Sequence, residues 1–132
     1  MKRTLDADVL IGALDSTDPH HPKVRGAFQS WRASGDSLWV SVINLSEVLV
    51  APSEDPALLR KARTAITALG IEIHAPIEAI GVDAARLRGR HPISLPDAFL
   101  IATAKHIDAA VASFDRKVLR AAQHEGIPAT TP

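Results

Sequence analysis

Cysteine is absent from this sequence, so the chain has no disulfide framework and no thiolate metal site. Net charge is absent as well, because 15 basic residues balance 15 acidic residues. Any binding of RNA or DNA therefore depends on local patches or on bridging metal ions. No apolar run approaches the ~18 residues of a membrane span. Asp6 interrupts the N-terminus before a signal-peptide core can form, so we expect a soluble, cytoplasmic protein with no membrane partner.

Internal repeats, low-complexity segments and long linkers are missing too. A chain of 132 residues with 46% hydrophobic and 23% charged residues is typical of one globular domain. It is long enough to bury roughly two-thirds of its unfolded surface. We therefore expect a single domain over residues 1–132.

Short apolar strands alternate with helices along the chain. Strands are expected at residues 4–5, 37–40, 71–74, 109–114 and 127–130. Helices are expected at residues 7–14, 20–33, 42–50, 57–69, 76–88, 95–104 and 116–125. Asp18 and Ser41 are the expected N-caps of the second and third helices, and Leu58 and Ile66 are expected on the buried side of the fourth. This alternation predicts a three-layer α/β/α fold with a central parallel sheet of four to five strands.

The helix after Ser94 is apolar on nearly all sides from Ala98 to Ala104, which is typical of a buried helix. Ser94 is its expected N-cap, and Asp97 lies in the first turn, at the positive end of the helix. Asp97 can therefore either complete a capping box with Ser94 or serve as a functional carboxylate.

Three further acids occupy comparable places in the chain. Asp6 and Asp115 each end an expected strand. Glu47 lies in the second turn of the helix after the second strand, on the same face as Asn44. Ligands bind beyond the carboxyl ends of parallel strands, so these acids and Asp97 should gather at one edge of the sheet.

Such a cluster is costly without a cation, because two carboxylates at ~5 Å repel by about 3 kcal/mol at an effective dielectric constant near 20. Oxygen ligands suit Mg²⁺ or Mn²⁺, and these ions activate water for attack on a phosphodiester. The acids Asp6, Glu47, Asp97 and Asp115 thus predict a metal site that needs no protein nucleophile. The alternative for Glu47 is a side chain that points into water at the edge of its helix.

Four stretches resemble the motifs of PIN domains, in the order in which PIN domains carry them. These stretches are Leu5–Ile11, Ser41–Val48, Leu95–Ala98 and Ser113–Arg116. The short single-domain form is similar to the VapC toxins of bacterial type II toxin–antitoxin pairs. The resemblance implies a Mg²⁺- or Mn²⁺-dependent endoribonuclease that cleaves RNA and is restrained by a VapB-like antitoxin. It also implies that the four acids are the catalytic and metal-binding residues.

Two positions depart from the PIN pattern. Asp8 stands where serine or asparagine is common and adds a fifth acid, but Asp6 is preferred as the ligand because it ends the strand. Ser113 stands where threonine is common, and it keeps a hydroxyl that can hydrogen-bond to a carboxylate. Asp8 and Ser113 are therefore expected beside the metal ligands rather than among them.

Two other features carry weaker signals. Arg86, Arg88 and Arg90 form a basic run that either contacts RNA or complements the dipole at the end of a helix. His20 and His21 lack the i, i+4 spacing of a helical zinc pair, so a zinc site is not expected there.

An apolar stripe of Val24, Phe28 and Trp31 suggests a surface that a chain of this size does not cover completely. Together with the resemblance, it predicts a homodimer and a tight complex with the antitoxin. Trp39 is expected in core or dimer packing rather than in base stacking.

Two other classes of function compete with the nuclease. A phospho-acceptor signalling domain also uses an acidic Mg²⁺ pocket, but it needs an aspartate after a middle strand, and the strand at 71–74 is followed by Ala75 and Pro76. That class is excluded. A non-catalytic PIN-like binding module should have lost one or more acids, whereas all four positions are filled here. This module, and a PIN-family nuclease outside a toxin–antitoxin pair, are the alternatives to the toxin.

Overall fold

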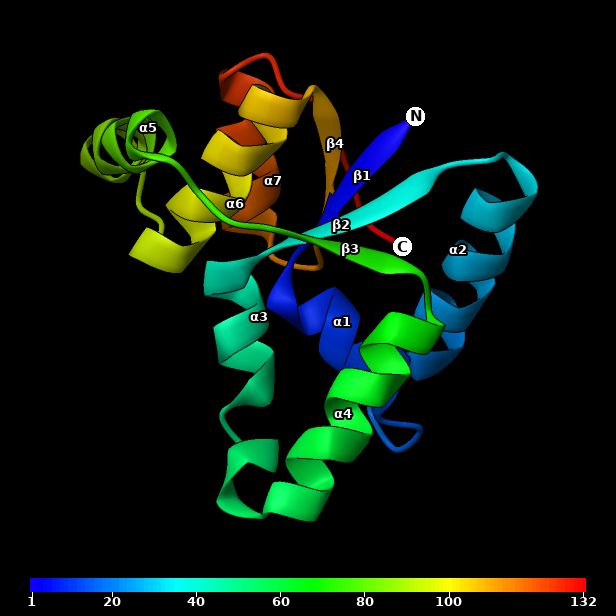
Figure 1. Ribbon diagram of the computed structural model, residues 1–132. Helices are drawn as coiled ribbons and strands as arrows, with labels where there is room; N and C mark the ends of the chain where they lie inside the picture. Colours follow the sequence, from blue (N-terminus) through cyan, green and yellow to red (C-terminus); the bar gives the residue numbers. More distant parts are fainter.

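Five short strands form one parallel sheet through the middle of the molecule, as Figure 1 shows for the computed structural model, which describes residues 1–132. The strands are β1 (Lys2–Leu5), β2 (Ser37–Ser41), β3 (Ile71–His74), β4 (Ala109–Ala112) and β5 (Ala129–Thr130). Their order across the sheet is β3-β2-β1-β4-β5, and every neighbouring pair is parallel. The first strand therefore lies at the centre, between β2 and β4.

Helices cover both faces of this sheet (Figure 1). One layer contains α1 (Ala7–Leu14), α2 (His21–Ala33), α3 (Val42–Leu49), the short 3₁₀ turn η1 (Pro52–Glu54) and α4 (Pro56–Ala68). The other layer contains α5 (Glu78–Arg90), α6 (Leu95–Ile107) and α7 (Arg116–His124). The predicted three-layer α/β/α fold is confirmed, with five strands in the sheet. None of the helices is both long and apolar enough to cross a membrane.

Two hydrophobic cores lie on opposite faces of the sheet, because successive strand residues point to opposite sides. Leu5 and Ala112 belong to the core beneath α1, α2, α3 and α4, whereas Val111 belongs to the core beneath α5, α6 and α7. Helix α6 supplies much of the second core, since its residues from Ala98 to Ala104 are buried apart from a half-buried Phe99. The prediction of a buried helix after Ser94 is thus confirmed.

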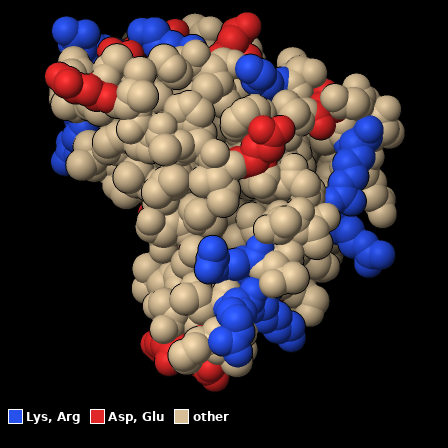
Figure 2. Space-filling view, viewed as in Figure 1, with Lys and Arg blue, Asp and Glu red and all other residues tan.

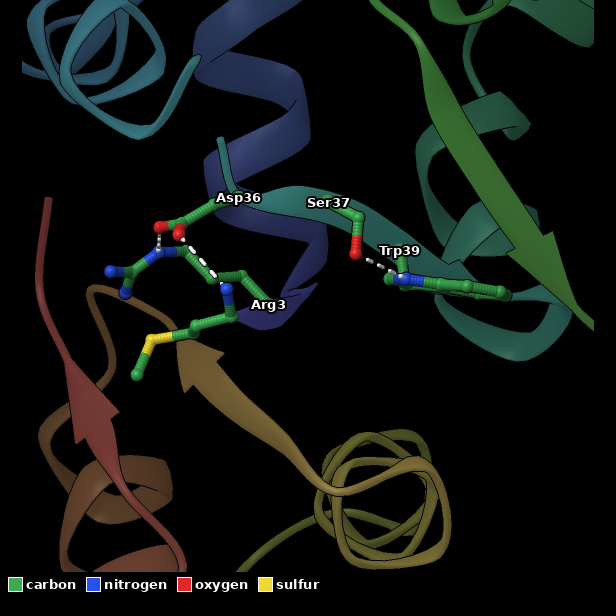
Figure 3. A network of polar contacts seen from close by, with 5 residues as sticks. Arg3, Asp36, Ser37 and Trp39 are labelled. Atoms are coloured by element: carbon green, nitrogen blue, oxygen red, sulfur yellow. Dashed lines mark hydrogen bonds and ion pairs between the residues drawn. The ribbon is translucent and has the colours of Figure 1, made fainter. Parts of the chain in front are cut away.

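A polar network joins β1 and β2 at their amino ends (Figure 3). Arg3 Nε donates to Asp36 Oδ2 at 2.7 Å, and the amino group of Met1 donates to Asp36 Oδ1 at 3.2 Å. The Arg3 guanidinium also lies over the ring of Trp31, 4.9 Å from its centroid. The hydrogen bond from Arg3 holds the pKa of Asp36 below its usual value. These contacts fix one end of the central strand and leave its other end, at Asp6, for the site.

Several elements end at other residues than predicted, and the structure gives the reason for β4 and α6. β4 ends at Ala112 rather than at residue 114, because the backbone N–H of Phe114 donates to the carboxylate of Asp8 at 3.1 Å instead of extending the ladder. Helix α6 runs on to Ile107, where Asp108 adopts the left-handed conformation with φ 56° and ends it.

Two helices begin later than predicted. Asp18 is not the N-cap of α2, because its side chain accepts from the N–H of His20 at 2.8 Å, forming a local turn, and the helix starts at His21. Helix α5 begins at Glu78 rather than at residue 76, since Ile77 is still extended.

The surface also differs from the prediction in two places. Val24, Phe28 and Trp31 are only 0%, 5% and 7% exposed, because α2 packs this stripe into the first core. The prediction that the stripe is a docking surface is therefore wrong. Ile66 is buried as expected, but Leu58 is 52% exposed, since it lies near the outer end of α4, beside η1.

Candidate active site

Asp6 lies where the central strand β1 meets α1. Its backbone N–H continues the sheet by donating to the carbonyl of Ala112 at 2.9 Å, and its side chain caps α1. Oδ1 accepts from the N–H of Ala7 at 2.7 Å, and Oδ2 accepts from the hydroxyl of Ser113 at 2.6 Å. The carboxylate is only 6% exposed. The end of the strand and the start of the helix thus hold one acid rigidly inside the protein.

The surroundings of Asp6 oppose its ionisation. Burial raises its pKa from 3.8 to about 7, and the Asp8 and Asp97 carboxylates add to the increase. Hydrogen bonds from Ser113 and Ala7 act in the opposite direction but do not cancel it. A proton or a cation is therefore needed to neutralise this carboxylate near neutral pH.

Asp8 lies two residues further along, in the first turn of α1. Oδ2 accepts from the N–H of Phe114, whereas Oδ1 is buried and has no hydrogen-bond partner. Burial raises the pKa of Asp8, the nearby Asp115 adds to the increase, and His20 opposes it. The free buried oxygen is an unused acceptor inside the acidic cluster.

Asp115 and Ser113 lie on the neighbouring segment after β4. Asp115 caps α7, because its Oδ1 accepts from the N–H of Lys117 at 2.8 Å. The N–H of Asp115 donates to the Ser113 hydroxyl oxygen at 3.0 Å, and the same hydroxyl donates to Asp6. One serine side chain therefore links two of the four predicted metal ligands.

Asp97 lies in the first turn of α6 and forms a capping box. Its N–H donates to Ser94 Oγ at 3.2 Å, and its Oδ2 accepts from the N–H of Ser94 at 3.3 Å. The half-buried carboxylate also contributes to the raised pKa of Asp6. Asp97 thus completes the capping box and belongs to the acidic cluster at the same time.

Glu47 lies on the exposed side of α3. Its Oε1 accepts from the Nδ2 of Asn44 at 3.2 Å, and that amide also donates to the carbonyl of Pro96 at 3.2 Å. Asn44 is fully buried, and its Oδ1 has no partner. The sequence placed Asn44 on the face of Glu47 but did not show that it joins α3 to the first turn of α6, beside Asp97.

The donor set of this cluster suits a hard divalent cation. Asp6, Asp8, Asp97 and Asp115 offer carboxylate oxygens, and the unpartnered Oδ1 of Asp8 is available as an acceptor. No three His, Cys, Asp or Glu side chains, however, are close enough together to hold a metal ion as they stand. Asp6 and Asp115 therefore lie on neighbouring segments at one edge of the sheet, and joint metal binding by Asp6, Glu47, Asp97 and Asp115 stays a prediction.

Two histidines near the cluster have distinct surroundings. The ring of His20 stacks on Phe114, with centroids 3.7 Å apart and planes 9° apart. His21 Nδ1 lies 2.7 Å from the carbonyl oxygen of Gly12. The position of His20 near Asp8 was not predicted, because it depends on how the α1–α2 loop folds back.

The basic run at the end of α5 is partly neutralised. Arg86 lies 3.6 Å from Asp83, and Arg90 donates to Glu125 at 2.6 Å, whereas Arg88 makes no ion pair. Hydrogen bonds from His91 and Arg90 hold the pKa of Glu125 below its usual value. The run therefore offers fewer free cations than the sequence indicated.

Solved structures of similar fold include a VapBC complex, a toxin–antitoxin complex and a VapC toxin. A VapBC2 complex from Rickettsia felis bound to a promoter DNA fragment superposes with a TM-score of 0.77 at 14% identity, covering 99% of this chain and 98% of that one. A toxin–antitoxin complex from Klebsiella pneumoniae gives 0.72 at 22% identity, with 89% of each chain covered. VapC20 of Mycobacterium tuberculosis, described as a sarcin–ricin loop cleaving toxin, gives 0.73 at 14% identity, covering 90% of this chain and 94% of that one.

At the level of sequence, no curated protein matches this chain significantly. The model of the PIN domain family does match, from residue 4 to residue 124. That range contains all four predicted motifs and the whole acidic cluster. The chain therefore belongs to the PIN domain family.

Proposed function

We propose that this protein is a metal-dependent endoribonuclease and the toxin of a type II toxin–antitoxin pair. The observation that carries the proposal is the buried Asp6, whose pKa is raised to about 7 by burial and by neighbouring carboxylates. Where the ionised form of an acid is this unfavourable, a bound cation can neutralise the carboxylate and stabilise it. Asp6, Glu47, Asp97 and Asp115 would hold Mg²⁺ or Mn²⁺, which supplies activated water and offsets the charge that develops on the scissile phosphate.

The protein's own residues would position these acids. The Ser113 hydroxyl orients Asp6 and binds the backbone of Asp115, so it would keep the two residues in a fixed position relative to each other. Asn44 orients Glu47 and contacts the carbonyl that precedes Asp97. Asp8 would lie beside the ligands, with one oxygen held by a backbone N–H. Such preorganisation lowers the cost of assembling the site when RNA binds.

An apolar groove supports an antitoxin as partner. It lies between α1, α3, η1 and α4, encloses about 480 Å³ and is lined mostly by apolar side chains, among them Ile11 and Leu58, which are 37% and 52% exposed. Exposed apolar surface of this kind is typical of a protein-binding site. We assign it to an apolar segment of a VapB-like antitoxin.

A homodimer would use other residues than the buried stripe of α2. Exposed apolar side chains lie at Val42, Ile77, Val82 and Leu95, on or next to three helices, and α6 packs against both α3 and α5.

Arg88, which has no acidic partner, is the member of the α5 run that we propose as an RNA contact. The toxin would act in the cytoplasm, where its RNA substrate is found.

The decisive experiment is cleavage of single-stranded and structured RNA by the purified protein in Mg²⁺, Mn²⁺ or EDTA. We expect cleavage with either metal and none in EDTA, and loss of cleavage in Asp97→Asn. The matched control is Asp83→Asn, which removes an acid of α5 outside the cluster and should cut normally. Cleavage that survives EDTA would refute the metal mechanism.

The toxin assignment needs a second experiment. RNA ends are sequenced after brief expression with and without the neighbouring antitoxin gene. Defined new ends that disappear with the antitoxin support the toxin. Cleavage that the neighbour leaves unchanged points to a PIN nuclease outside such a pair, and no cleavage with any metal points to a non-catalytic binding module.

A further inference from the structure

A second groove lies between helix α7 and the segment that connects α5 to α6. It encloses about 510 Å³, and no acidic side chain lines it. Its polar lining comes from Lys117, Arg120, Gln123 and His124 of α7 and from His91 of the connecting segment. We call it the α7 groove.

The positive charge of the α7 groove is not neutralised by the protein. Lys117 and Arg120 are exposed, and neither lies within ion-pair distance of a carboxylate. His91 differs, since its Nε2 lies 3.0 Å from Glu125, and Arg90 binds the same carboxylate. The two α7 cations are therefore available to an anion from outside.

Both walls of the α7 groove are close in the chain to residues of the acidic cluster. Lys117 comes two residues after Asp115, whose side chain accepts from the Lys117 backbone N–H. On the other wall, Pro92 comes five residues before Asp97. The start of α7 and the segment before α6 therefore place the α7 groove next to the segments that carry Asp115 and Asp97.

The spacing of the basic residues suits a polyanion. Lys117, Arg120 and His124 recur at i, i+3 and i+7, so they share one face of α7, opposite the buried Val118 and Ala122. Seven residues of helix span ~10 Å. A stacked nucleic-acid strand carries one phosphate per ~3.4 Å, so this face can meet about three phosphates.

Other basic groups are placed less well for this role. Lys and Arg side chains gather over α4 and along α2 (Figure 2), including Arg60, Lys61 and Arg63. Lys61 borders the apolar groove assigned above to the antitoxin, and Arg60 and Arg63 line a shallow hollow beside the edge strand β3. Because the whole chain has no net charge, RNA must be attracted by a local patch next to the cluster.

We propose that the α7 groove binds the phosphate backbone of the RNA strand beside the scissile bond. This inference rests on the proposed ribonuclease function and names the surface that holds its substrate. Lys117 and Arg120 contact phosphates. Because every nucleotide carries the same phosphate group, these contacts do not depend on the base sequence.

The test compares Lys117→Gln/Arg120→Gln with a matched control, Arg60→Gln/Arg63→Gln, which removes the same charge from α4. Binding of a short fluorescein-labelled single-stranded RNA is measured by anisotropy in EDTA over a range of salt concentrations. The α7 variant should bind about tenfold more weakly, and its slope of log K against log salt should fall by about 1.4, at about 0.7 per lost phosphate contact. The control should behave as wild type. In Mn²⁺, the α7 variant should raise KM for cleavage far more than it lowers kcat.

The outcomes separate this inference from the proposed function. Wild type that neither binds nor cuts RNA would refute both. Wild type that cuts RNA while the α7 variant keeps the affinity, salt slope and KM of wild type would overturn the α7 groove alone. An α7 variant that keeps RNA affinity but loses affinity for the antitoxin would also overturn it, and would make the groove a protein-binding surface.

Discussion

The charge on Asp6 should destabilise the metal-free protein, and its removal should therefore stabilise it. The pKa of Asp6 rises from 3.8 to about 7 on folding, chiefly because the carboxylate is buried. At about 1.4 kcal/mol per pKa unit, this shift corresponds to about 4 kcal/mol. The folded state binds the extra proton, so the free energy of unfolding falls as pH rises from about 4 to about 7 and changes little above that range.

Asp6→Asn removes this cost but also weakens one hydrogen bond. The amide can accept from Ala7 or from Ser113 as the carboxylate does, but it cannot accept with both terminal atoms, which costs about 1 kcal/mol. In EDTA at pH 8, the variant should therefore be about 3 kcal/mol more stable than wild type. At pH 4, where Asp6 is protonated in the folded protein, it should be about 1 kcal/mol less stable.

Urea unfolding in EDTA at the two pH values measures these differences. The control, Asp83→Asn, removes a half-buried carboxylate that contacts Arg86 outside the cluster and should show no such reversal. Adding Mn²⁺ at 100 times its dissociation constant should stabilise wild type by about 2.7 kcal/mol, and Asp6→Asn by much less. The reasoning fails if Asp6→Asn is less stable than wild type by the same amount at both pH values.

Three further variants test the surrounding contacts. Asp97→Asn should abolish cleavage while the melting temperature in EDTA stays equal to or above that of wild type, since asparagine still caps a helix; a melting temperature several degrees lower would make Asp97 mainly a cap. Ser113→Ala should cost about 1–3 kcal/mol and shift the pH profile of cleavage to higher pH, because the hydroxyl lowers the pKa of Asp6. An unshifted profile would contradict this role. Asn44→Ala should destabilise the protein by about 1–3 kcal/mol in urea and reduce kcat more than it changes KM, and unaltered cleavage would show that Glu47 needs no such support.

Local signals in the sequence predicted most of the elements. Ser41 and Ser94 cap α3 and α6 as expected, because a serine before an apolar helix can satisfy its first N–H groups wherever the helix lies in the fold. Asp18 misled the prediction, since an aspartate before proline can equally close a turn. The order of the strands could not be predicted, because it depends on pairings between segments far apart in the chain.

The closeness of Asp6 and Asp115 was predictable for a similar reason. Parallel strands end at one edge of a sheet, so Asp6 and Asp115 had to lie near each other. The contact from Asn44 to the carbonyl of Pro96 could not be predicted, because it joins residues that are 52 positions apart and depends on how α3 packs against α6. The α7 groove likewise depends on the position of the α5–α6 connection, which no local pattern specifies.

The central place of β1 has a consequence for synthesis on the ribosome. Its partner β4 begins at Ala109, and the hydrogen bond from Ser113 to Asp6 joins residues 107 positions apart. A nascent chain that has not yet reached Ser113 therefore has an open edge on its first strand and an incomplete acidic cluster. Translation that stops early would release an inert fragment that is prone to aggregation through that edge. The ribosome must synthesise the chain at least as far as Asp115 before the cluster can form, so no shorter nascent chain should be active.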